Sequence, residues 1–196
     1  MASTPDPARR SERARLAVLD AALAVCRDNG FAQLTIEAIA ERAGVSKKTI
    51  YRWWPSKGAV LLDAVADSAT TLVTYEDTGD LARDMCAQLN SVVAMLTPQE
   101  TSPLAAVIAE AQREPALAQA LRDQMRPRIE GFEERLRRAQ HAGDLPAHAD
   151  LGVALDLFYG PIYHRLAFHF GMPDEEEIRS RVDHVIAALR AADPAR

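Results

Sequence analysis

Residues 35–57, TIEAIAERAGVSKKTIYRWWPSK, constrain the fold of this chain more than any other stretch. Thr35 is a good helix N-cap, and apolar residues follow it at helical spacing. Gly44 then supplies a residue suited to the left-handed position that ends a helix. Ser46 can cap a second helix over residues 47–54, which a proline ends. Two short helices joined by a turn that contains glycine form a helix-turn-helix.

The second helix of such a motif lies in the major groove of DNA. Here it combines cations, hydroxyl groups and an aromatic ring, with Ile50 as its expected buried anchor. We expect phosphate contacts from Thr35, Tyr51, Trp53 and Lys57, and base-edge contacts from Lys47, Lys48, Thr49 and Arg52, with Ser46 at the helix start. Lys57 also adds its charge to the N-terminus of a third helix, which favours phosphate. The alternative is a helical hairpin with a solvated basic face.

A longer segment carries a resemblance to a known family. In order along the chain it contains Gly30-Phe31, Thr35, Ile39-Ala40, Ala43-Gly44-Val45-Ser46, Thr49-Ile50-Tyr51 and Ser56-Lys57. This segment, from about Arg13 to Leu62, resembles the DNA-binding domain of the TetR/AcrR family of transcriptional regulators. Agreement at many positions is a more specific signal than a single short motif. Trp53 departs from the His or Tyr common at this position of the family, and an indole nitrogen donates a hydrogen bond without a charge.

Charge is distributed unevenly along the chain, whose formal net charge is −5. Residues 1–58 hold ten Lys and Arg against six Asp and Glu, a net charge of +4, so the remainder carries −9. The sequence contains three lysines, Lys47, Lys48 and Lys57, and all of them fall within residues 1–58. This asymmetry draws the N-terminal part towards phosphate while the acidic remainder is repelled.

Composition limits the class of protein. With 48% hydrophobic and 26% charged residues, the 196-residue chain is typical of a globular protein. Cys26 and Cys86 have no neighbours at metal-ligand spacing, so we expect buried thiols rather than a disulfide. We see neither a signal peptide nor an apolar run of membrane-spanning length. We therefore expect a cytoplasmic protein that does not associate with a membrane.

Helical periodicity continues to the C-terminus, and no alternating run indicates a β-strand. We therefore expect an all-α fold of about nine helices. The expected organisation is a disordered arm over residues 1–10, a helix-turn-helix domain over 11–56 and a helical regulatory and dimerisation domain over 57–196. The helix from Lys57 to about Thr74 would link the two domains. Pro127 should kink or split a long helix over residues 115–143, and the sequence leaves these alternatives open.

One helix-turn-helix contacts a single half-site, so we expect a homodimer that reaches two half-sites. The last two helices have the most apolar surface for pairing into a four-helix bundle, and the resemblance to TetR regulators implies the same dimer. The alternative is that both apolar rows belong to the core of one chain. The expected interface residues are Leu151, Leu155, Phe158, Ile162, Leu166, Ile178, Val182, Val185, Ile186 and Leu189.

The resemblance also implies a pocket for a small-molecule effector in the C-terminal part, but no ligand signature transfers beyond about Thr70. Polar and aromatic residues on otherwise apolar helices are the remaining guide. They are Gln88, Met125, Phe132, Phe158, Tyr159, Tyr163 and His164. We expect no cofactor and no metal, because His164 and His169 do not share a helix face and no carboxylate completes a site.

Together with what the resemblance to TetR regulators implies, these patterns lead us to expect a ligand-responsive, homodimeric repressor of TetR type that binds palindromic operator DNA. A small molecule would release it by favouring a spacing of the two DNA-binding domains that fits the operator poorly. Two alternatives remain open. One is an activator or architectural protein that uses the same DNA-binding domain without sensing a ligand. The other is an all-helical enzyme, which lacks a paired-carboxylate, nucleophile-base or metal constellation at convincing spacing.

Overall fold

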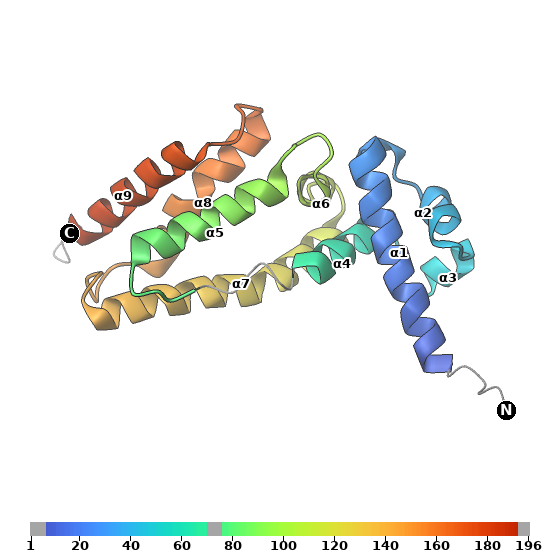
Figure 1. The fold of residues 1–196 in the computed structure, drawn as a ribbon, viewed down its shortest axis with the longest axis horizontal. Coiled ribbons are helices and arrows are strands. Elements are labelled where there is room, and N and C mark those ends of the chain that lie inside the picture. The colour runs from blue at the N-terminus through green and yellow to red at the C-terminus, as the bar shows by residue number, and fades with distance from the viewer. Residues whose placement is uncertain (1–6, 70–75, 192–196) are drawn as a thin grey trace. The chain divides into compact units, whose positions relative to one another are not determined.

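The computed structural model of the chain describes residues 7–69 and 76–191, and all regular structure within these ranges is helical (Figure 1). This confirms the predicted all-α fold. The elements are α1 (Pro7–Asn29), the short 3-10 turn η1 (Phe31–Gln33), α2 (Ile36–Ala43), α3 (Lys47–Tyr51), α4 (Lys57–Ala69), α5 (Leu81–Leu96), α6 (Pro103–Ala111), α7 (Pro115–Ala142), α8 (Leu151–Phe168) and α9 (Glu175–Ala191).

The helix ends near residue 45 follow directly from local chemistry. The Thr35 hydroxyl accepts a hydrogen bond from the backbone N–H of Ala38 at 3.0 Å, and the Ser46 hydroxyl accepts one from Thr49 at 3.2 Å. Gly44 ends α2 with φ 66°, a left-handed conformation that costs little without a Cβ atom. The predicted helix-turn-helix is therefore present as α2 and α3.

Several boundaries differ from the sequence prediction. α1 begins at Pro7, so it includes the last residues of the predicted arm, and residues 1–6 lie outside the described residues. α3 ends at Tyr51 rather than at residue 54. α7 continues through Pro127 as one helix, which removes the alternative of a split. The predicted end of the linking helix near Thr74 also lies outside the described residues, which include this helix as far as Ala69.

The chain forms two compact units. The first contains α1 to α4, α6 and residues 115–122 of α7; the second contains α5, the rest of α7, α8 and α9. This division differs from a boundary between residues 56 and 57, because α4 packs on α1 and on α6 inside the first unit. In the second unit α9 packs on α5 and α8.

A close approach in the first unit explains why Gly58 follows Lys57. A Cβ atom at Gly58 would lie 2.8 Å from Cδ2 of Leu117, which is buried. Beside it, the Ser56 hydroxyl donates to the Glu114 carboxylate at 3.2 Å and accepts from the backbone N–H of Ala59. The start of α7 therefore packs directly against the first turn of α4.

Candidate nucleic-acid interface

Helix α3 and the turn that follows it are fixed by two buried side chains, Ile50 of α3 and Trp54 of the turn. Ile50 is fully buried, and the largely buried Trp54 donates a hydrogen bond from Nε1 to Oδ2 of Asp63 on α4 at 2.7 Å. The ring of Trp53 packs edge-on against Trp54, with centroids 5.4 Å apart. Ile50 is the anchor that the sequence predicted, whereas the contact between Trp54 and Asp63 was missed because it joins two helices.

The opposite side of α3 is exposed and cationic. We call the side chains of Lys47, Lys48, Tyr51 and Arg52 the DNA-binding face; all four are exposed, Tyr51 to 56%. The guanidinium carbon of Arg52 lies 4.6 Å from the ring centroid of Trp53, and this cation–π contact holds the guanidinium in place. The structure therefore brings these predicted DNA-binding residues together on one surface.

Three further predicted residues lie at the ends of the helices. Thr35 and Ser46 use their hydroxyl groups as N-caps, and the Thr49 hydroxyl lies 2.9 Å from that of Ser46. These hydroxyl groups shape the backbone of the motif. Thr35 and Ser46 are also exposed, and Thr49 is partly buried.

Lys57 is held at the start of α4 on the surface of its own unit. Its Nζ lies 4.2 Å from the ring centroid of Phe31 and donates to the backbone carbonyl of Phe31 at 3.4 Å. The ammonium group thus lies at a helix N-terminus, where both the side chain and the backbone favour an anion.

The sequence did not identify Glu37, which reaches the DNA-binding face from α2. Nζ of Lys47 donates to Oε1 of Glu37 at 2.8 Å, and both side chains are more than half exposed. This hydrogen bond lowers the pKa of the Glu37 carboxyl and raises the pKa of the Lys47 ammonium. Both groups therefore stay ionised at neutral pH.

The second unit contains a buried ion pair. Nη2 of Arg135 lies 2.6 Å from Oδ2 of Asp84, and each side chain is 2% exposed. Burial raises the pKa of Asp84, but hydrogen bonds from Thr78 and Arg135 outweigh it and leave the pKa below its ordinary value. Asp77 adds a second carboxylate 3.6 Å from Arg135. The pair joins α7 to α5 and to the segment before it.

The residues predicted to line an effector pocket separate into two groups. Phe132 contacts Phe158 and Tyr159, with ring centroids 6.0 and 5.6 Å apart, and Gln88 is 7% exposed. His164 instead contacts Phe168 and Phe170, whose rings are exposed. Met125 is partly buried, and Tyr163 is 36% exposed.

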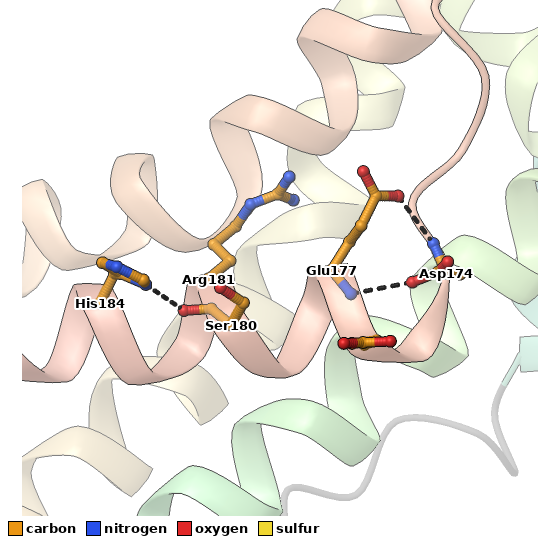
Figure 2. A pocket seen from close by; sticks show the side chains of 6 residues that line it. Asp174, Glu177, Ser180, Arg181 and His184 are labelled. Atoms are coloured by element: carbon orange, nitrogen blue, oxygen red, sulfur yellow. Dashed lines mark hydrogen bonds between the residues drawn. The ribbon is translucent and has the colours of Figure 1, made fainter.

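A different cleft of 460 Å³ lies along α9 and is shown in Figure 2. Glu177 and Arg181 project to the same side of the helix, and the backbone N–H of Glu177 donates to Asp174 at 2.8 Å. The pKa of the Arg181 guanidinium is lowered, mainly by burial and secondly by the positive charge of the nearby Arg165. The cleft is lined by Asp174, Glu176, Glu177, Ser180, Arg181 and His184. It contains none of the residues predicted for the effector pocket.

Most residues predicted for a dimer interface are buried within the single chain. This group contains Phe158, Ile162, Leu166, Ile178, Val182, Val185, Ile186 and Leu189, while Leu151 and Leu155 are partly buried. A side chain buried in its own chain has little area left to bury against another. Val153, Leu157, Phe168 and Phe170 are the large apolar side chains of this region that stay exposed by 40% or more.

Among residues 7–69 and 76–191, no three His, Cys, Asp or Glu side chains are grouped so that they could hold a metal ion. No helix in the described part of the chain is long and apolar enough to cross a membrane.

Comparison with known proteins places both parts of the chain in one family. Residues 18–64 match the family model of bacterial regulatory proteins of the tetR family, and residues 75–185 match the tetracyclin repressor-like C-terminal domain. The HTH-type transcriptional regulator YdeS of Bacillus subtilis is 32% identical over 183 residues, covering 93% of this chain and 92% of YdeS. The DNA-binding transcriptional repressor TetR of Mycobacteroides abscessus is 29% identical and covers 92% and 95% of the two chains.

Solved structures agree with this assignment. The TetR family transcription regulator SCO0332 superposes with a TM-score of 0.74 at 34% identity, covering 89% of this chain and 97% of SCO0332. FadR from Bacillus subtilis, solved in complex with stearoyl-CoA, has a TM-score of 0.65 at 17% identity, which shows a shared fold. FadR matches 90% of this chain and 97% of its own. These matches describe transcriptional regulators rather than enzymes, and the chain belongs to the TetR family of DNA-binding transcriptional regulators.

Proposed function

We propose that this regulator is a repressor that binds palindromic operator DNA as a homodimer and leaves it when a small molecule binds in the second unit. The exposed cationic side of α3, fixed from within by Ile50 and Trp54, is the observation that carries the proposal. A rigid helix with exposed donors is suited to the major groove. Because its target is operator DNA, we expect the protein in the cytoplasm.

The contacts with DNA divide into two classes. Lys47, Lys48, Thr49 and Arg52 reach base edges, where lysine and arginine favour guanine. Thr35, Tyr51, Trp53 and Lys57 contact phosphates, and Ser46 holds the start of α3. The position of Lys57 over Phe31 at the first turn of α4 supports a phosphate contact.

Gel-shift experiments with the DNA upstream of its own gene test this function. The expected result is a retarded complex whose affinity falls steeply as salt is added, since counterions are released when phosphates are neutralised. A retarded complex that forms equally well at low and high salt, or no complex at all, would contradict the proposal.

The homodimer is proposed on the exposed apolar residues of α8. Val153 and Leu157 are one helical turn apart, and leaving both in water is costly for a single chain. A homodimer would supply the two recognition helices that half-sites about 34–36 Å apart require.

Substitution at matched positions tests the dimer by analytical ultracentrifugation. Leu157→Glu should shift the protein from dimer to monomer, because the charge would enter the proposed interface. Leu16→Glu is the control: Leu16 on α1 is also 40% exposed and should leave the dimer intact. A wild-type monomer at micromolar concentration would remove the proposal.

The effector is proposed to be largely apolar with a group that forms hydrogen bonds. Gln88 on α5 is more than nine-tenths buried, and its side-chain amide can both donate and accept a hydrogen bond. Buried polar groups almost always have a partner. The aromatic cluster of Phe132, Phe158 and Tyr159 belongs to the same unit. The stearoyl-CoA complex of FadR supports the proposal that a protein of this fold can hold a ligand.

Native mass spectrometry of the purified protein can identify a retained small molecule. Gln88→Leu has nearly the same volume and should weaken retention of a polar effector while the protein stays folded. Equal retention by the wild type and by Gln88→Leu would exclude Gln88 from the contact.

A further inference from the structure

The Glu37–Lys47 ion pair differs from the other contacts of the DNA-binding face. Lys47 is the first residue of α3 and Glu37 lies in the first turn of α2, and their charged atoms are 2.8 Å apart. The Glu37 side chain is 65% exposed and the Lys47 side chain is 56% exposed. Exposed ion pairs of this kind contribute little to folding. A stabilising role therefore does not explain why a carboxylate lies on a surface that must meet phosphate.

The other cations near this surface are not paired in this way. Across the described part of the chain, no ion pair joins Lys48, Arg52 or Lys57 to a carboxylate; Arg52 contacts Trp53, and Lys57 contacts Phe31. Their charges remain available to phosphate or base edges. The charge of Lys47 is cancelled locally by Glu37, so one of the three lysines is neutralised on the free protein.

Two effects of Glu37 would oppose DNA. A base-edge or phosphate oxygen that approaches Lys47 must first displace the carboxylate, since both compete for the same ammonium. In addition, the first helix of a helix-turn-helix crosses the DNA backbone. A carboxylate in the first turn of α2 then approaches phosphates and repels them.

We propose that Glu37 acts as an electrostatic brake on DNA binding by occupying Lys47 in the free protein. The inference rests on the proposed contact between Lys47 and DNA. The brake lowers the affinity for DNA of any sequence, because Glu37 repels phosphates, which every sequence carries. Binding to an operator then relies more strongly on base contacts.

Removing the charge of Glu37 while keeping its shape tests the brake. We expect Glu37→Gln to bind a short duplex of mixed sequence about two- to fivefold more tightly at low salt, the range set by exposed ion pairs. The dependence of log K on log salt should steepen by about 0.9 for each motif that contacts DNA. Glu37→Ala should give the same steepening. Fluorescence anisotropy over a salt series measures both quantities.

Asp28 supplies a matched control. Asp28 and Arg42 form a similar ion pair at 2.7 Å, with side chains 53% and 47% exposed, between α1 and α2. Asp28→Asn changes the net charge by the same amount without freeing Lys47, so the salt slope should stay near that of the wild type. Equal changes of the salt slope in Glu37→Gln and Asp28→Asn would mean that net charge alone causes the effect. That result would overturn the brake.

Lys47→Ala separates failure of the brake from failure of the proposed contact. If the contact exists, Lys47→Ala weakens binding, and adding Glu37→Gln to it changes the salt slope less than Glu37→Gln does alone. Should Lys47→Ala bind as the wild type does, the contact and the brake both fail. Should Lys47→Ala weaken binding while Glu37→Gln leaves the slope unchanged, only the brake fails.

Discussion

The Glu37–Lys47 pair of the first unit and the Asp84–Arg135 pair of the second have similar lengths, 2.8 and 2.6 Å, in opposite surroundings. Water solvates Glu37 and Lys47, so Lys47 can exchange the carboxylate for an oxygen of DNA at little cost. Asp84 and Arg135 are each 2% exposed, so neither can lose its partner without leaving a buried charge. An exposed pair of this kind can therefore exchange partners, whereas the buried pair holds the second unit together.

Breaking the buried pair should have the largest effect. Arg135→Met keeps most of the side-chain volume but leaves Asp84 buried without its cation, so the free energy of unfolding should fall by about 3–5 kcal/mol. Urea denaturation followed by circular dichroism measures the change. Arg137→Met is the control on the same helix, because Arg137 pairs with Glu133 at 2.6 Å while exposed to 44%. Similar losses in both variants would contradict the distinction between buried and exposed pairs.

Substitutions among the exposed charges should alter DNA binding rather than stability. Lys48→Ala should weaken discrimination among operator sequences by about tenfold, because a base-edge contact is lost. Lys57→Ala should weaken binding to all sequences and reduce the salt slope by about one for each motif that contacts DNA. Binding of each variant to an operator and to scrambled duplexes measures the difference. Identical behaviour of the two variants would refute the division into base and phosphate contacts.

Lowering the pH should have a smaller effect on the free energy of unfolding, through protonation of Asp84. The pKa of Asp84 lies below its ordinary value in the folded chain, so its stabilising contribution is complete above the unfolded pKa. That contribution is lost as pH falls through the folded pKa. The stability difference between wild type and Asp84→Asn should therefore narrow below about pH 4. Urea denaturation across a pH series would show a constant difference if Asp84 were not responsible.

The sequence predicted the helix-turn-helix well because its signals are local. The caps at Thr35 and Ser46 and the left-handed Gly44 each depend on residues within one helical turn. Such contacts are visible as spacing in the sequence. Continuation of α7 through Pro127 was left open, because a helix can repair a proline only through surroundings that spacing does not reveal.

Contacts between helices could not be predicted in the same way. Glu37 and Lys47 are ten residues apart, and Asp84 and Arg135 are 51 apart, so each pair depends on how two helices cross. The apolar stripe of α9 was recognised, but periodicity cannot distinguish a core within one chain from an interface between two. The burial of Ile178 and Val182 within the chain supplies that distinction.

Footprinting the wild-type protein on the DNA upstream of its own gene tests the central claim most directly. We predict two protected half-sites related by twofold symmetry, about 34–36 Å or a multiple of that distance apart, with protection that weakens as salt is added. A single unsymmetrical protected site, or protection that salt does not change, would contradict a dimer that binds DNA through two copies of α3.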